Sequence, residues 1–268
     1  MIPKKMKTVL VTNDDGYISS GYLPLLQILS KTYHVIPVAP RVKKSWIGKA
    51  VTAYHDLEIQ TITYEGFDIH TLNGTPADCV QIGCYHLLDS FPDYVISGIN
   101  LGTNIGIARL LSSGTVGAAM EAALASIPSL AISLSIPPEI RTHHNWYHSE
   151  SYTFFRGPAD ITLKLSSMIF ECPIDKQFFS LNIPFNATIE TPIDVTIPFD
   201  ASYGSLFEIT EQRLQHRVPP VQYQHMQKGT DIYTLYHDRV SLTPLNLSMV
   251  SLEQVQIVKE YMQKQWRI

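Results

Sequence analysis

Two adjacent acidic residues, Asp14 and Asp15, follow a short apolar run in the segment VLVTNDDGY (residues 9–17). Neighbouring carboxylates repel each other, and a divalent cation removes this repulsion while using both as hard oxygen ligands. Gly16 allows the backbone to turn sharply behind the pair. The alternative is an Asp-Gly turn on the surface, which needs no metal. Because the pair follows a predicted buried strand, we favour the cation site.

Two neutral oxygen donors follow other predicted strands. Ser45 lies in APRVKKSWIGKA, and Asn100 lies in SGIN. In open α/β sheets ligands bind beyond the carboxyl ends of the strands, so these residues are expected to meet Asp14 and Asp15 there. The four would form an incomplete shell, which leaves positions for water and a phosphate oxygen. Taken singly, Ser45 also suits an ordinary loop and Asn100 an ordinary turn.

The segment SSGTVGAA adds a candidate anion site. Its Ser113, Gly114 and Thr115 would offer backbone N–H groups and hydroxyls at the positive end of a helix dipole, where phosphate binds well. The alternative is a plain N-cap, followed by close helix packing through small residues. The segment alone leaves both interpretations open.

Strand and helix patterns alternate along the first 185 residues, which predicts an α/β fold with a mostly parallel sheet and helices on both faces. Thr75, Pro76 and Asp78 mark one helix start especially clearly. The expected strands are residues 8–12, 33–39, 94–97, 129–134 and 178–183, with a hairpin within 50–72. The expected helices are residues 21–31, one starting at 75, 114–126, 152–170 and 249–265.

The pattern changes near residue 185, where prolines and spaced aromatic residues replace the strand and helix alternation. We therefore divide the chain into a catalytic core, residues 1–185, and a C-terminal extended arm, hairpin and helix, residues 186–268. Such an arm is often a subunit contact, so we expect a homo-oligomer.

The composition restricts the partners. The 268 residues include 20 basic and 24 acidic side chains, a net charge of −4, which argues against duplex nucleic acid and anionic membranes as partners. Cys79, Cys84 and Cys172 are an odd, scattered set with no C-x-x-C pair, as expected for a cytoplasmic protein. The apolar stretch 122–136 is interrupted and too short to span a membrane.

Six motifs occur in the order seen in the stationary-phase survival protein family, SurE, which the chain therefore resembles. They are VTNDDGY, VAPRVKKSWIGKAVT, NGTPADCV, PDYVISGINLGTNIG, SGTVGAAMEAALASIPSLAIS and VSLTPL. The resemblance implies a Rossmann-like core with exchanged C-terminal arms in homodimers or homotetramers. It also implies a metal-dependent 5′-nucleotidase that hydrolyses nucleoside monophosphates to nucleoside and phosphate, with 3′ phosphates as a further candidate substrate.

The resemblance assigns roles by position. It implies that one divalent cation per subunit, Mg²⁺ or Mn²⁺, is held by Asp14, Asp15, Ser45 and Asn100, with the two aspartates as catalytic residues. It also implies that the segment Ser113, Gly114 and Thr115 binds the phosphate group.

One loop departs from the family pattern. Leu101 stands where members usually carry a basic residue, and the loop 107–112 is one residue longer. Phosphate binding then requires Arg109, Arg41 or a nearby lysine to take over this role. A non-catalytic nucleotide-binding protein is thus the main alternative, and a glycosyltransferase-like enzyme with a paired-acid metal site is the third hypothesis.

Two further features have open interpretations. Trp46, beside Ser45, suits either stacking on a nucleobase or packing on a neighbouring subunit. The histidines of RTHHNWYH, residues 143, 144 and 148, suit a solvated or subunit-contact loop better than a transition-metal site, because no carboxylate stands at a fixed spacing.

Overall fold

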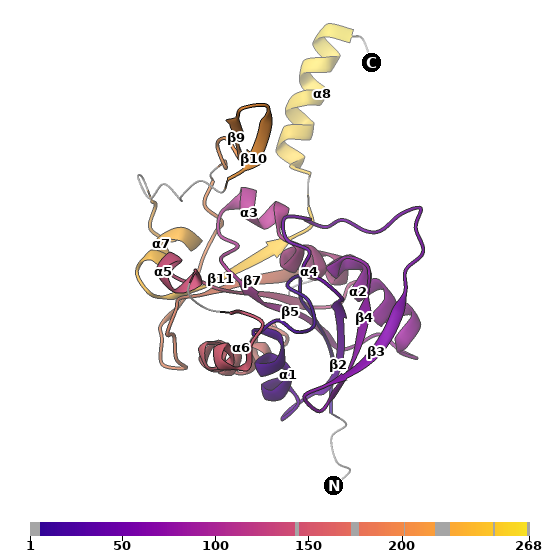
Figure 1. Cartoon of the computed structure of the whole chain (residues 1–268). Helices are drawn as coiled ribbons and strands as arrows, with labels where there is room; N and C mark the ends of the chain where they lie inside the picture. Colours follow the sequence, from indigo (N-terminus) through magenta and orange to yellow (C-terminus); the bar gives the residue numbers. More distant parts are fainter. Residues whose placement is uncertain are drawn as a thin grey trace.

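A mostly parallel sheet with helices on both faces forms the body of the protein, as the sequence predicted (Figure 1). The computed structural model describes residues 6–142, 145–172, 177–200, 202–217, 226–248 and 250–266. Within these ranges the sheet has nine strands in the order β3-β4-β2-β1-β5-β6-β7-β11-β8. The strands are β1 (Thr8–Thr12), β2 (His34–Pro40), β3 (Ile59–Tyr64), β4 (Phe67–Leu72), β5 (Tyr94–Leu101), β6 (Ser129–Leu134), β7 (Gln177–Ile183), β8 (Ile193–Val195) and β11 (Val240–Asn246).

Helices pack on both faces of this sheet around two buried apolar clusters. One cluster lies under α1 (Tyr22–Leu29) and α6 (Thr153–Ile169), and the other under α2 (Pro76–Ile82) and α4 (Gly114–Leu124). The shorter helices are α3 (Ile107–Ser112), α5 (Pro138–Arg141) and α7 (Asp231–Tyr236), with a π-helical turn at Gly83–Leu87 and a 3-10 turn at Ser149–Tyr152.

The start of α2 follows the sequence signals closely. The hydroxyl of Thr75 accepts a hydrogen bond from the backbone N–H of Asp78, and the Asp78 carboxylate accepts one from the Thr75 N–H. Pro76 occupies the first turn. This capping box satisfies two backbone donors that the helix itself leaves unpaired.

Three neighbouring parallel strands, β2, β1 and β5, end at the same edge of the sheet. α1 leaves β1 on one face, whereas α2 enters β5 from the other, so the strand order reverses direction between β1 and β5. A crevice opens beyond the strand ends at such a point. The residues following β1 and β2 and the last residues of β5 therefore meet there.

The structure differs from the expected element limits in two ways that affect the site. β5 runs to Leu101 rather than ending at residue 97, with an irregularity in its pairing to β6 between Ser97 and Asn100. The short helix α3 occupies the loop after it, where polar and small residues predicted no helix.

The chain beyond residue 185 contributes to the main sheet as well as forming an extension. β8 and β11 lie in the sheet, and β11 pairs antiparallel with β7. The hairpin of β9 (Phe207–Thr210) and β10 (Arg213–His216) and the helix α8 (Leu252–Trp266) project away from the sheet (Figure 1). No described helix is long and apolar enough to cross a membrane.

Candidate active site

The paired acids sit in a tight buried turn at the end of β1. Asn13 holds this turn, because its side-chain amide donates to the Gly16 carbonyl over 2.9 Å and its Oδ1 accepts from the Gly16 N–H over 3.1 Å. Gly16 has a φ of +93°, which side-chain-bearing residues rarely adopt. Asp14 and Asp15 are only 4% and 2% exposed, so this is not a surface turn.

Asp14 is a buried carboxylate whose ionised form is energetically unfavourable in the absence of a cation. Burial and the neighbouring charge of Asp15 raise the pKa of Asp14 to about 7, and a hydrogen bond from Thr115 opposes the rise. That bond joins Thr115 Oγ1 to Asp14 Oδ1 over 2.7 Å, and Thr115 is fully buried. The hydroxyl thus fixes one oxygen of the carboxylate and favours its ionised form.

Asp15 does not itself line the pocket, but it contacts Lys43, which does. Its Oδ2 accepts the backbone N–H of Leu101 over 2.9 Å, and its Oδ1 lies 2.8 Å from Lys43 Nζ. The ammonium group therefore places a positive charge directly beside the acidic pair. This contact ties the loop after β2 and the end of β5 to the same turn.

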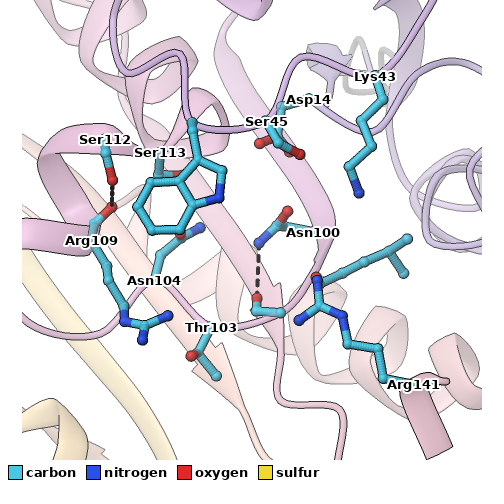
Figure 2. A pocket seen from close by; sticks show the side chains of 13 residues that line it. Asp14, Lys43, Ser45, Asn100, Thr103, Asn104, Arg109, Ser112, Ser113 and Arg141 are labelled. Carbon is cyan, nitrogen blue, oxygen red and sulfur yellow. Dashed lines mark hydrogen bonds between the residues drawn. The ribbon is translucent and has the colours of Figure 1, made fainter. Parts of the chain in front are cut away.

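A pocket of about 380 Å³ lies at these strand ends. Asp14, Ser45 and Asn100 line it from three different strand ends, and Figure 2 shows their side chains directed toward a common space. Asn100 donates from Nδ2 to the Gly102 carbonyl over 2.8 Å, which directs its amide oxygen toward Asp14. The pocket is thus lined by oxygen donors at one end.

This donor set fits a hard divalent cation. The two carboxylates, the hydroxyl and the amide oxygen are all oxygen ligands of the kind that Mg²⁺, Mn²⁺ and Ca²⁺ prefer. The raised pKa of Asp14 and the nearby Lys43 ammonium both indicate that the pair requires positive charge. Among the described residues no group of three or more His, Cys, Asp or Glu side chains clusters, so neutral oxygen donors such as Ser45 and Asn100 would have to complete the shell.

The predicted phosphate segment lies beside the pocket, with different roles for its side chains. Ser113 lines the pocket and caps α4, since its Oγ accepts the Val116 N–H over 3.1 Å. Gly114 lets α4 approach the acidic turn, because a Cβ there would lie 2.9 Å from Asp14 Cβ. The Thr115 hydroxyl is directed to Asp14 rather than into the pocket. Phosphate binding by this segment stays a prediction.

Cationic side chains reach the pocket from three elements: Lys43, Arg109 and Arg141 (Figure 2). Arg141 was not among the predicted candidates. It ends α5, donates from Nη2 to the Leu101 carbonyl over 2.9 Å, and lies where a side chain on Gly102 would meet its Nη1. The candidate Arg41 instead pairs with Glu58, 3.3 Å away, and does not line the pocket.

Buried polar contacts that sequence patterns did not indicate hold the loop after β5. Asn104 donates its backbone N–H to Asn182 Oδ1 and its side-chain amide to Ser133 Oγ, each over 2.8 Å. Asp231, at the start of α7, accepts the N–H of Gly106 over 2.7 Å. These hydrogen bonds join residues that are far apart in the sequence, so no local motif predicts them.

The histidine segment and Trp46 also have defined surroundings. His143 and His144 lie outside the described residues, and His148 is exposed. Trp46 lines the pocket and packs against Tyr203 and His216 of its own chain.

Comparisons with known proteins identify the family of this chain. The family model described as survival protein SurE matches residues 9–204. The chain is 31% identical to the 5′-nucleotidase SurE of Methanocella arvoryzae over 96% of this chain and 98% of that protein. It is 33% identical to the 5′-nucleotidase SurE of Methanocaldococcus jannaschii over 89% and 91% of the two chains. The crystal structure of the SurE protein from Aquifex aeolicus superposes with a TM-score of 0.78 and 29% identity, over 95% of this chain and 99% of that chain.

Proposed function

The chain belongs to the survival protein SurE family and is a 5′-nucleotidase that hydrolyses nucleoside monophosphates, and we propose that it acts through one divalent cation held by Asp14, Asp15, Ser45 and Asn100. The similarity to 5′-nucleotidases extends over nearly the whole chain, which favours hydrolysis over the binding-only protein and over glycosyl transfer.

The observation that carries the cation site is the meeting of oxygen donors from three strand ends. Asp14, Ser45 and Asn100 line one pocket, and Asp15 lies in the same turn. A cation beside the buried pair would offset the repulsion that raises the pKa of Asp14. The neutral donors would complete its shell without adding further negative charge.

The mechanism follows from what these residues hold. When bound, the cation, Mg²⁺ or Mn²⁺, neutralises charge on the phosphate and lowers the pKa of water. Asp14 has one oxygen fixed by Thr115, so its other oxygen is available to the ion. Whichever aspartate is less fully coordinated would accept the proton of the water that attacks phosphorus in line. The bond from phosphorus to the nucleoside oxygen would break on the opposite side, and this oxygen would take up a proton to give the nucleoside.

Phosphate binding is assigned to the start of α4 and to two arginines of the pocket. Ser113, Gly114 and Thr115 begin α4, where the first backbone N–H groups and the helix dipole favour an anion. Arg109 and Arg141 line the same pocket and offer guanidinium donors suited to phosphate oxygens. These two arginines would supply the positive charge that Leu101 does not.

Assembly and location are proposed on separate grounds. The hairpin β9–β10 and helix α8 carry exposed apolar side chains, which supports homodimers or homotetramers that exchange this arm. Leu214, Leu252 and Tyr261 are examples. The free cysteines Cys79, Cys84 and Cys172 support a reducing cytoplasm.

The test is phosphate release from 5′- and 3′-nucleoside monophosphates, with and without Mg²⁺ or Mn²⁺. The parent protein is compared with Asp14→Asn and with the matched surface control Asp160→Asn, whose side chain is exposed on α6. Metal-dependent release that is lost only in Asp14→Asn is expected. A parent that binds the metal and nucleotide but releases no phosphate would instead be the binding-only protein.

A further inference from the structure

Trp46 adopts a backbone conformation that bulky residues rarely accept. Its φ is +60°, and among the described non-glycine residues with positive φ it is the one that lines the pocket. Such a conformation is unfavourable for a side chain with a Cβ, and it persists only where the surroundings enforce it. Strained residues of this kind concentrate at functional sites, so the position calls for a reason beyond packing.

The surroundings of the indole show what enforces this placement. The ring lies 5.1 Å from the His216 ring and 5.4 Å from the Tyr203 ring, measured between centroids. The Tyr203 hydroxyl is anchored in turn to the carbonyl of Ala108 and the hydroxyl of Ser112. The residue Trp46 is nevertheless 40% exposed. Two aromatic neighbours thus support it without covering it.

The exposed part of the indole lies beside the proposed reaction centre. Trp46 follows Ser45, and both line the pocket with Asp14 and Asn100. Among the described residues that line this pocket, Trp46 is the one aromatic side chain, and most of the others are polar or charged. The volume of the pocket, about 380 Å³, is in the range of small-molecule sites.

We propose that Trp46 is the nucleobase platform of this enzyme, on which the heterocycle stacks while the phosphate lies at Asp14, Ser45 and Asn100. This inference rests on the proposed nucleotidase function and extends it to the part of the substrate that does not react. Stacking on an aromatic ring is tolerant of base identity because every base offers a π face. The platform would therefore select nucleotides over sugar phosphates, and it would favour purines through their larger rings.

The kinetic test uses two substrates with the same phosphate ester. Phosphate release is compared for adenosine 5′-monophosphate and for ribose 5-phosphate, which lacks the base. In Trp46→Gly, kcat/KM for the nucleotide is expected to fall roughly 5- to 150-fold with kcat/KM for ribose 5-phosphate unchanged. Glycine also relieves the positive φ, so loss of folding is not expected. The matched control Trp46→Phe keeps an aromatic face at the same position and should retain most of the preference for the nucleotide.

Other outcomes separate the possibilities. If kcat/KM falls equally for both substrates in Trp46→Gly, Trp46 supports Ser45 rather than the base. Equal kcat/KM values for the two substrates in the parent would also overturn the proposal. If the parent releases phosphate from neither substrate, the nucleotidase function fails instead. In that case a titration of tryptophan fluorescence with adenosine 5′-monophosphate still tests the stacking. Quenching that occurs in the parent and is absent in Trp46→Phe supports stacking on Trp46, whereas quenching of the same size in that variant refutes it.

Discussion

The hydroxyl of Thr115 gives the sharpest test of how the acidic pair is controlled. It donates a 2.7 Å hydrogen bond to Asp14 Oδ1 in a fully buried position, so Thr115→Val removes the bond while keeping the shape of the side chain. A hydrogen bond to a charged group contributes roughly 1.5–3 kcal/mol. If that energy orients and ionises Asp14 for the cation, affinity for Mn²⁺ should fall about 10- to 150-fold.

The assay is a Mn²⁺ titration of metal-free protein, followed by nucleotide kinetics at saturating Mn²⁺. Thr115→Ser retains the hydroxyl and is the matched control, expected to bind Mn²⁺ nearly as the parent does. The sequence placed Thr115 in the phosphate site, and that role predicts a different pattern. Parental Mn²⁺ affinity in Thr115→Val together with a raised KM for the nucleotide would refute the orienting role and leave Thr115 with phosphate binding alone.

Three further predictions follow from the same site. Arg141→Met should raise both the KM for a nucleoside monophosphate and the inhibition constant of inorganic phosphate about tenfold or more, because a charged hydrogen bond to phosphate is lost. If both constants stay at the parental values, Arg141 lies outside the phosphate site. Gly114→Ala should lower the free energy of unfolding by about 1–3 kcal/mol, measured in urea titrations. The reason is that the new Cβ would lie 2.9 Å from Asp14 Cβ and 3.1 Å from the Lys44 carbonyl oxygen. An unchanged free energy of unfolding would contradict this close packing. In metal-free protein, burial and Asp15 raise the pKa of Asp14 to about 7, whereas an unfolded carboxyl titrates near 4. The folded state therefore holds the extra proton between these values, and the free energy of unfolding should fall as the pH rises from about 4 to 7. Urea denaturation with a chelator should show this slope reduced in Asp14→Asn, and the same slope in both proteins would exclude Asp14 as its source.

The strand-end residues were accessible to sequence reasoning because they depend on local order. An apolar run followed by Asn-Asp-Asp-Gly predicts both a buried strand and a polar turn at its end. Parallel neighbours then bring Asp14, Ser45 and Asn100 to one edge of the sheet, which is where the structure has them. Glycine and capping patterns are similarly local, and the capping box of α2 was readable from Thr75 and Asp78.

Residues brought in by long-range packing were not accessible in this way. Arg141 reaches the pocket because α5 follows β6 and returns over the end of β5, and no motif around it indicates this position. Asp231 lies 125 residues from Gly106, the backbone group that it binds. Trp46 was left with two interpretations, since the positions of Tyr203 and His216 depend on how the later chain returns to the pocket.

The place of β11 in the sheet has a consequence during synthesis of the protein. β7 pairs with β6 on one side and with β11 on the other, and β11 leaves the ribosome about 60 residues after β7. At about 5–20 residues per second, the apolar edge of β7, including Phe178 and Leu181, stays unpaired for about 3–12 s. An exposed strand edge of this kind recruits other chains. The nascent chain is therefore prone to aggregation during this interval, which ends only when β11 emerges and pairs with β7.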